Sequence, residues 1–255
     1  MTTVTTRNPT LLVFLPTFNE ADNIGRMLTS LSAHAPDWPG STRVVVMDDG
    51  SCDDTVEIAE GFRGSVPVSV VRRPHEGLGA TLLAGVRLAV ADEALDYLVT
   101  LEADSTGDLD AIPRMLCVAA DGADVVQGSS HHPEGGLASV QAGRGMASRA
   151  ANLMLRHATG MRLHTFTHFQ RVLRVAALRR SLELHGDHLV RETGFAGVAE
   201  LVVTMGHDGA QIVEVPITHD GSRRVGPSRM PIASTVGGEL RMAGRFALGR
   251  ALGRT

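Results

Sequence analysis

The 255-residue chain contains no lysine, only two cysteines and few aromatic residues. Cys52 and Cys117 cannot build a disulfide framework and do not lie at the spacing of metal ligands, so we expect a reducing, cytoplasmic environment. Aromatic residues make up 4% of the chain and no nucleic-acid-binding motif occurs, so nucleic acid is not an expected partner. No apolar run reaches the roughly 18 residues of a transmembrane helix. The first ten residues also lack the apolar core of a secretory signal.

The charges that are present are distributed unevenly. Residues 1–150 carry 10 arginines and 20 acidic residues, whereas residues 151–255 carry 14 arginines and 8 acidic residues. The first half therefore has a net charge of −10 and the second half a net charge of +6. An acidic half suits a divalent cation, and a basic half suits phosphate groups or an anionic surface.

Short apolar runs alternate with helical patterns in the first hundred residues. Strands are predicted at residues 11–15, 44–47, 66–71 and 97–101, and helices at residues 19–31, 54–62 and 79–91. This alternation predicts an α/β fold whose mostly parallel central sheet has helices on both faces. Ligands of such sheets bind where the strands end, so the polar segments after the strands are the expected site.

The second half of the chain is less regular. Strands are predicted at residues 124–127 and 212–215, and helices at residues 143–160, 200–205 and 237–254. We find no repeat or linker and expect one domain over residues 1–230, followed by a basic amphipathic helical segment over residues 231–255. That segment could lie on an anionic membrane. The alternative is a terminal helix packed on the domain.

Two acidic segments follow predicted strands. The carboxylates of Asp48 and Asp49, next to Ser51, can accept hydrogen bonds from a base or ribose, although a turn that caps the next helix has the same composition. Glu102 and Asp104 lie one residue apart, so both side chains point the same way from an extended backbone. Such a pair can hold a divalent cation that neutralises a diphosphate leaving group. A plain polar loop is the alternative.

Other segments suit phosphate. Gly77 and Gly79 precede a predicted helix, where backbone N–H groups can approach a phosphate, or they form a simple turn. Arg144 and Ser148 lie four residues apart, on one helical face that can bind an anion. A solvated arginine is the alternative there.

Residues 220–230 form a basic loop that could close over a diphosphate or remain a solvated surface. Its polar candidates are Arg223, Arg224, Ser228 and Arg229. Two histidine pairs, His164 with His168 and His185 with His188, have the spacing of zinc ligands, but neither a zinc motif nor a serine-hydrolase motif accompanies them.

The order of these segments resembles the family 2 glycosyltransferases with a GT-A fold, and among them the dolichol- and polyprenyl-phosphate mannose synthases. The resemblance covers residues 10–232. It rests on the segments FLPTFNEADNI, VVMDDGSCDDT, RRPHEGLGATLLAGVRLA, LVTLEADST, RGMASRAAN, GFAGVAEL, IVEVPI and RRVGPSRM. It implies a Rossmann-like GT-A domain that binds a nucleotide sugar.

The resemblance also implies roles for individual residues. The first nucleotide-binding loop would consist of Pro16, Thr17, Asn19 and Glu20. The rest of the nucleotide would be held by Asp48, Asp49, Ser51, Gly79, Arg223, Ser228 and Arg229. Mg²⁺ or Mn²⁺ would be bound by Glu102 and Asp104. Catalytic roles fall to Asp104, Arg144, Ser148 and Arg171, among which Arg144 and Ser148 would hold the acceptor phosphate.

The implied reaction moves a sugar, expected to be mannose from GDP-mannose or else a sugar from a UDP donor, to polyprenyl phosphate. It would proceed with inversion at the anomeric carbon and with peripheral contact at the inner face of the membrane. The chain departs from the family pattern at Glu102, Thr106, Ser130, Thr165 and Val198, where the pattern has Asp, Gln, Arg, Asp and Gln. Two alternatives therefore stay open: a soluble small-molecule acceptor, and a catalytically altered relative with a different ligand.

Overall fold

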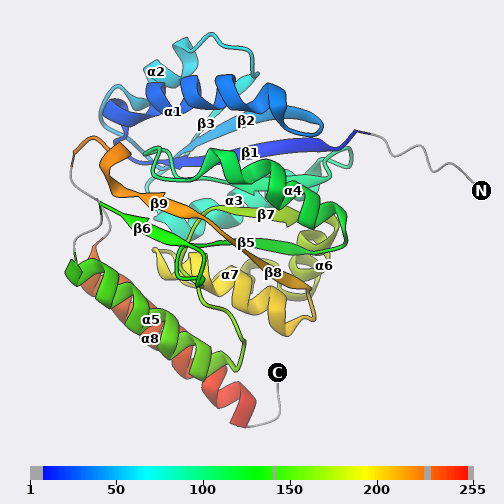
Figure 1. Cartoon of the computed structure of the whole chain (residues 1–255), viewed down its shortest axis with the longest axis vertical. Coiled ribbons are helices and arrows are strands. Elements are labelled where there is room, and N and C mark those ends of the chain that lie inside the picture. The colour runs from blue at the N-terminus through cyan, green and yellow to red at the C-terminus, as the bar shows by residue number, and fades with distance from the viewer. Residues whose placement is uncertain (1–7, 140–141, 227–230, 252–255) are drawn as a thin grey trace, which may run out of the picture.

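The computed structural model describes residues 8–139, 142–226 and 231–251. A seven-stranded sheet lies at the centre with helices on both of its faces (Figure 1). The strand order is β3-β2-β1-β4-β7-β5-β8, and a small second sheet pairs β6 with β9. The predicted fold class is therefore confirmed.

The elements of the central sheet are mostly parallel. Its strands are β1 (Thr10–Thr17), β2 (Ser41–Asp48), β3 (Val68–Arg72), β4 (Tyr97–Thr100), β5 (Val125–Ser129), β7 (Arg171–Arg174) and β8 (Ile212–Pro216). Only β7 is antiparallel to its neighbours, β4 and β5. The small parallel sheet consists of β6 (Gly136–Ala138) and β9 (Thr218–Asp220).

Helices cover the sheet on both sides. They are α1 (Ala21–His34), α2 (Thr55–Gly61), α3 (Leu78–Ala91), α4 (Ile112–Ala120), α5 (Ala142–Thr159), α6 (Val175–His185), α7 (Ala196–His207) and α8 (Ile232–Ala251). Short 3₁₀ turns lie at Ala35–Asp37, Leu109–Ala111, Gly186–His188 and Gly221–Arg223. No helix within the described ranges is long and apolar enough to cross a membrane.

The strand β1 explains why the core has two parts. Leu12 and Phe14 pack into a cluster with α3, α6 and α7, whereas Leu11, Val13 and Leu15 pack into a second cluster with α1 and α4. All five side chains are at most 3% exposed. A strand buried on both faces must be apolar at every position, which is why LLVFL reads as one continuous run.

The six strands expected from the sequence are all present, but several elements were not expected. The sequence did not indicate β7, α4 or α6. Strand β7 has only four residues, two of them arginines, so it lacks both an apolar run and a clear alternation. Its insertion between β4 and β5 turns a parallel sheet into a mixed one.

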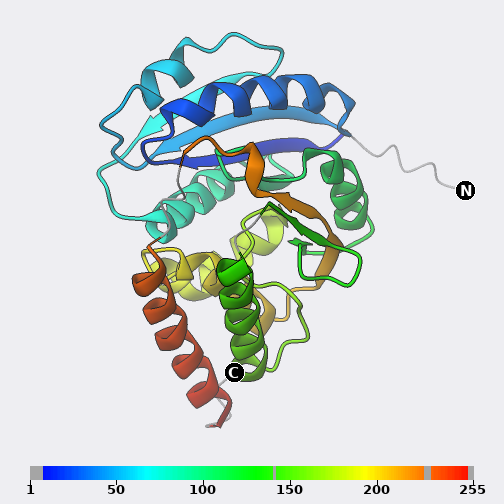
Figure 2. The same ribbon diagram turned by 60° about the vertical axis from the view of Figure 1, so that its left-hand side comes forward.

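Helices α5 and α8 pack against each other and extend away from the sheet (Figures 1 and 2). Two arginines of α8 pair with acidic residues around α7. Arg241 donates to Glu192 at 2.7 Å, and Arg245 donates to Glu192 at 2.8 Å and also pairs with Glu200. Both carboxylates are buried. These arginines of the expected basic helix therefore attach α8 to the domain.

Glu239 of α8 makes the stability of this helix depend on pH. Its side chain is 5% exposed, and burial raises its pKa to about 7 from an ordinary 4.5. The folded state favours the protonated form, so stability should fall as pH rises from about 4.5 through 7. We expect Glu239→Gln to stabilise the protein at pH 8 by up to about 3 kcal/mol, and much less at pH 5. Urea unfolding at both pH values measures this, and an equal effect at both would contradict it.

Candidate active site

A cavity of about 540 Å³ opens where the strands end. Its wall includes residues from both halves of the chain. From the predicted set it includes Pro16, Thr17, Glu20, Asp49, Glu102, Asp104 and Ser148. Because parallel strands end at one edge of the sheet, segments far apart in the sequence meet there. The structure thus brings seven of the sixteen expected site residues into one cavity wall.

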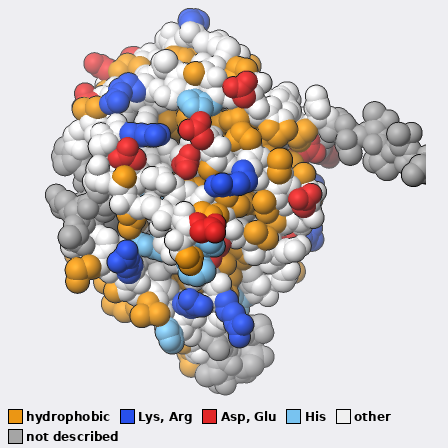
Figure 3. All heavy atoms as spheres, viewed as in Figure 1, with side chains coloured by type: hydrophobic (Ala, Val, Ile, Leu, Met, Phe, Trp, Pro, Cys, Tyr) orange, Lys and Arg blue, Asp and Glu red, His pale blue; other side chains and the backbone are white. Residues whose placement is uncertain are grey.

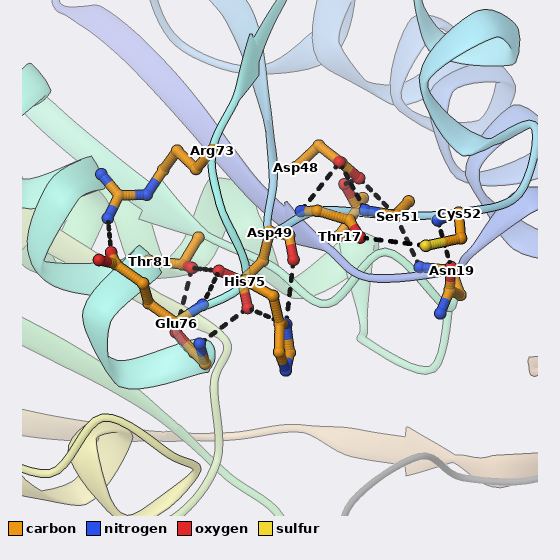
Figure 4. A network of polar contacts seen from close by, with 12 residues as sticks. Thr17, Asn19, Asp48, Asp49, Ser51, Cys52, Arg73, His75, Glu76 and Thr81 are labelled. Carbon is orange, nitrogen blue, oxygen red and sulfur yellow. Dashed lines mark hydrogen bonds and ion pairs between the residues drawn. The ribbon is translucent and has the colours of Figure 1, made fainter.

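Asp48 organises the first two loops rather than the cavity wall (Figure 4). It is buried and accepts hydrogen bonds from the Thr17 hydroxyl at 3.1 Å and the Ser51 backbone N–H at 2.9 Å. Ser51 in turn accepts from the Asn19 N–H at 2.7 Å, and Asn19 accepts from the Cys52 N–H at 2.8 Å. Asn19 has a φ of 56°, a conformation that asparagine tolerates better than most residues. These side chains hold the two loops in register.

Asp49 joins the second loop to the start of α3. Its buried carboxylate accepts from the backbone N–H groups of Glu76 at 3.0 Å and Gly77 at 2.8 Å, and from the Thr81 hydroxyl at 2.9 Å. His75 lies 2.9 Å from the same carboxylate and stacks on Phe18, with ring centroids 4.2 Å apart. Phe18 and His75 both line the cavity. Sequence reasoning missed this ring pair, which no local motif marks.

The two acidic residues after β4 share one hydroxyl partner. The hydroxyl of Thr106 lies 2.6 Å from Asp104 and 3.1 Å from Glu102. The other oxygen of Asp104 forms an ion pair with Arg224. Burial acts to raise the pKa of Glu102, but the interactions with His168, His219 and Arg224 and the Thr106 hydrogen bond favour the carboxylate and outweigh burial, so the net shift is downward. Glu102 is therefore ionised at neutral pH.

The carboxylates of Glu102 and Asp104 suit a hard divalent cation that also binds a ligand. Within the described ranges no three histidine, cysteine or acidic side chains are arranged to hold a metal alone. Mg²⁺ commonly binds proteins through one or two carboxylates and completes its shell with water and substrate phosphates. Glu102 and Asp104 supply those two carboxylates from one wall of the cavity. The Arg224 guanidinium, on Asp104 here, would have to give way on that side.

Two histidines stand next to the acidic pair. His168 and His219 line the cavity, with ring centroids 5.4 Å apart and planes at 84°. Burial lowers the pKa of His168 to about 4, against the opposing charge of Glu102. His168 is therefore neutral at physiological pH. The sequence places His168 at zinc-ligand spacing from His164, but His164 instead bonds to Glu214 at 2.8 Å.

The acceptor side carries hydroxyl and imidazole groups. Ser148 of α5 lines the cavity and lies 2.9 Å from Nε2 of His131. Burial, followed by the charge of Arg149, lowers the pKa of His131, which favours its neutral form. Ser130 and Thr165 also line this side. Arg144 belongs to α5, but its side chain lies outside the described part of the structure.

Three predicted site residues have other positions. Arg171 is 1% exposed and does not line the cavity. Its guanidinium donates to the Gln127 side chain at 2.6 Å and to the carbonyls of Val198 and Phe166 at 2.6 and 2.8 Å. Burial lowers its pKa to about 9. The structure therefore places Arg171 behind the cavity wall, where it connects three segments; the catalytic role implied by the resemblance stays a prediction.

Gly79 serves packing rather than phosphate binding. Its N–H donates to the Thr193 carbonyl at 2.6 Å, so it is not free for a ligand. The neighbouring Gly77 lines the cavity instead.

In the basic loop, Arg223 lies 3.7 Å from Asp220 and its guanidinium is half exposed. It is Arg224, absent from the implied set, that reaches Asp104. Ser228 and Arg229 lie outside the described residues.

Comparison with known proteins defines the class. Residues 12–182 match the model of the protein family described as Glycosyl transferase family 2. Polyprenol monophosphomannose synthase of Mycolicibacterium smegmatis is 30% identical over 222 residues, which span 86% of this chain and 80% of that protein. Undecaprenyl-phosphate 4-deoxy-4-formamido-L-arabinose transferase of Pseudomonas aeruginosa is 30% identical over 157 residues, 60% of this chain and 44% of that protein.

Solved structures support the fold. Glucosyl-3-phosphoglycerate synthase from Mycobacterium tuberculosis, crystallised with Mn²⁺, uridine diphosphate and glucosyl-3-phosphoglycerate, superposes with a TM-score of 0.59 at 18% identity. The match covers 92% of this chain and 80% of that one. The fold is that of a GT-A glycosyltransferase. The chain belongs to glycosyl transferase family 2, so the expected family and enzyme class are confirmed.

The contact at Gly79 yields a stability prediction. A Cβ at this position would lie 1.9 Å from the Glu192 carbonyl, whereas nothing lies within 4 Å of a Cβ at Gly244 in α8. We expect Gly79→Ala to destabilise the protein by at least about 2 kcal/mol, because backbone atoms must move. Gly244→Ala should stabilise it by up to about 1 kcal/mol. Chemical unfolding of both variants checks this, and equal effects would refute the packing role.

Proposed function

We propose that the protein transfers a sugar, mannose from GDP-mannose in the first instance, from a nucleotide diphosphate donor to a polyprenyl phosphate. The observation that carries the proposal is the position of Asp104. It lies in the cavity wall between the loops held by Asp48 and Asp49 and the hydroxyl-rich acceptor side, and it is paired with Arg224. The similarity to polyprenol monophosphomannose synthase supports the choice of sugar and acceptor.

The donor side offers suitable groups for a nucleotide. Phe18 and His75 present stacked rings at the cavity wall, and aromatic faces of this kind bind bases by stacking. Thr17, Glu20 and Asp49 provide polar groups beside them. We assign the nucleoside to this side and the diphosphate to the segment between Glu102 and Arg224.

The chemistry requires stabilisation of the leaving group. Mg²⁺ or Mn²⁺ held by Glu102 and Asp104 would supply positive charge to the diphosphate as it departs. The Arg224 guanidinium, which pairs with Asp104, can move to the diphosphate and add to this positive charge. An acceptor phosphate oxygen attacks the anomeric carbon, and the bonding pair of the broken C–O bond leaves with the nucleoside diphosphate. Attack from the opposite side inverts the configuration.

A phosphate acceptor needs no strong general base because it is already an anion. Ser148, with Arg144 one helical turn before it, is assigned to hold that phosphate. A soluble hydroxyl-bearing acceptor is the second candidate. The observation in its favour is the Ser148–His131 hydrogen bond, because a neutral imidazole at this distance can accept a proton through the serine.

A lipid acceptor calls for contact with a membrane, and α5 and α8 offer a surface for it. Among the described residues, the large exposed apolar side chains of these helices are Met146 and Leu153 on α5 and Val236, Leu240 and Leu248 on α8. Arg149 and Arg156 of α5 are exposed and have no carboxylate partner among the described residues. Acidic side chains gather over the β1–β3 half of the face in Figure 3, whereas arginines and histidines prevail toward α5 and α8. This mixture suits the interface of an anionic bilayer.

Replacement of Asp104 tests the catalytic assignment. We expect Asp104→Asn to lower kcat/KM by about 10²–10³-fold, because the leaving diphosphate loses charge stabilisation. The assay is release of GDP from GDP-mannose in the presence of polyprenyl phosphate and Mg²⁺. Asp110→Asn, on an exposed turn with 86% of its side chain accessible, is the matched control. Normal turnover by Asp104→Asn would sink the assignment, and turnover with soluble acceptors alone would favour the second candidate.

Replacement of leucines on α8 tests the membrane contact. The double variant Leu240→Asp/Leu248→Asp should reduce co-sedimentation with phosphatidylglycerol vesicles by at least about 10-fold, because each buried leucine contributes about 1.5–3 kcal/mol. Leu184→Asp is the control. It makes the same substitution at a leucine that is 69% exposed but belongs to α6, outside the α5 and α8 pair. Equal loss in both proteins would contradict a contact through α8.

A further inference from the structure

Two imidazoles in the cavity wall have nitrogen atoms without partners. Nε2 of His168 and Nδ1 of His219 are buried and make no hydrogen bond within the described part of the chain. The two rings come from separate segments, the approach to β7 and strand β9, yet they meet edge to face. Buried polar atoms in native proteins nearly always have partners. Two such atoms in one cavity wall therefore point to a ligand.

The hydrogen bond at the other ring nitrogen of His168 determines its tautomer. The backbone N–H of Gln170 donates to Nδ1 of His168 at 3.1 Å. Nδ1 must therefore carry a lone pair, and the ring hydrogen is assigned to Nε2. A metal at Nε2 would require that nitrogen to lose its hydrogen, and Nδ1–H would then face the N–H of Gln170. His168 is thus a donor to a ligand oxygen and is unsuited to metal binding.

The neighbouring carboxylate narrows the choice of ligand group. Glu102 lies beside both histidines, close enough for its charge to act on each of them. A phosphate oxygen could accept from His168, but without a cation between the two groups it would be repelled by Glu102. A hydroxyl group can accept from Nε2–H and donate to the carboxylate at the same time. Hydroxyl groups are therefore the chemistry that this cluster recognises.

The strand order places the cluster beyond the diphosphate. Along the sheet edge, β2 and β1 carry the nucleoside side, β4 carries Glu102 and Asp104, and β7, β5 and β8 follow. His168 precedes β7 by three positions and His219 follows β8. A nucleotide sugar is linear, with the sugar attached to the distal phosphate. Its sugar ring would reach the region of His168 and His219 if the nucleoside occupies the opposite end.

We propose that Glu102, His168 and His219 form a hydroxyl-binding subsite that recognises the transferred sugar of the donor. This inference rests on the proposed function. The subsite selects among donors by the positions of their sugar hydroxyls. Its two histidines contribute nothing to the binding of the nucleoside diphosphate alone, whereas Glu102 also serves the metal. The segment that contains His168 is one of those in which the chain departs from the family pattern, and Glu102 is itself a departure, so the selectivity belongs to this chain.

Calorimetric titration of matched ligands tests the subsite. GDP-mannose is compared with GDP, and UDP-glucose with UDP, each in the presence of Mg²⁺. We expect His168→Phe, which keeps a ring but removes the donor, to weaken the nucleotide sugar that the wild type binds by about 3- to 10-fold. Affinity for the matching nucleoside diphosphate should change less than about 2-fold. His168→Gln, which retains an N–H donor, should recover part of the loss.

Two further variants keep the test decisive. His157→Gln, an exposed position on α5, should leave both affinities unchanged. His219→Phe on the partly exposed β9 should repeat the selective loss, even if His168→Phe does not fold. Equal weakening of the nucleotide sugar and the diphosphate, or no weakening of either, would overturn the subsite. Failure of the wild type to bind any nucleotide sugar would instead overturn the proposed function, so the two failures are distinct.

Discussion

A buried guanidinium, which has no carboxylate partner in the described part of the chain, holds the acceptor half of this protein together. Arg171 is charged at neutral pH, and burial of an isolated charge costs several kcal/mol unless hydrogen bonds replace the lost water. Here one side-chain amide and two backbone carbonyls do so. Those partners belong to β5, to α7 and to the segment before β7. The one antiparallel strand, the helix behind it and the loop that carries His168 are therefore fixed relative to one another by a single side chain.

The donor half has a different organising principle. Asp48 and Asp49 are adjacent carboxylates with separate tasks, since one binds the first two loops together and the other caps the start of α3. Side chains at successive positions of an extended strand point in opposite directions, so neighbouring residues reach different loops. The loops on this side of the cavity are thus held by hydrogen bonds from backbone N–H groups to Asp48 and Asp49. These bonds lie within the protein and do not depend on which ligand is bound.

Much of the donor half could be predicted from the sequence because its signals are local. A strand buried on both faces is a continuous apolar run, and the acidic turn after it follows within three residues, as with Val44–Met47 and Asp48. The acceptor half has no such signals. Strand β7 is four residues long, and its neighbours in the sheet lie more than forty residues away in the sequence. The pairing of Phe18 with His75, or of Arg224 with Asp104, likewise depends on tertiary contacts that no spacing records. Gly79 and Arg171 follow the family pattern in sequence, yet neither lines the cavity, because a motif specifies residue types and not the direction in which they face.

The attachment of α8 links a distant helix to the wall of the cavity. Arg241 and Arg245 neutralise Glu192 and Glu200, and the backbone of Glu192 and Thr193 packs on Gly77 and Gly79 at the start of α3. A change that detaches α8 would leave two buried carboxylates without their counter-charges, and such groups are strongly destabilising. The segment at Gly77 and Gly79 therefore owes its rigidity in part to a helix on the far side of these carboxylates.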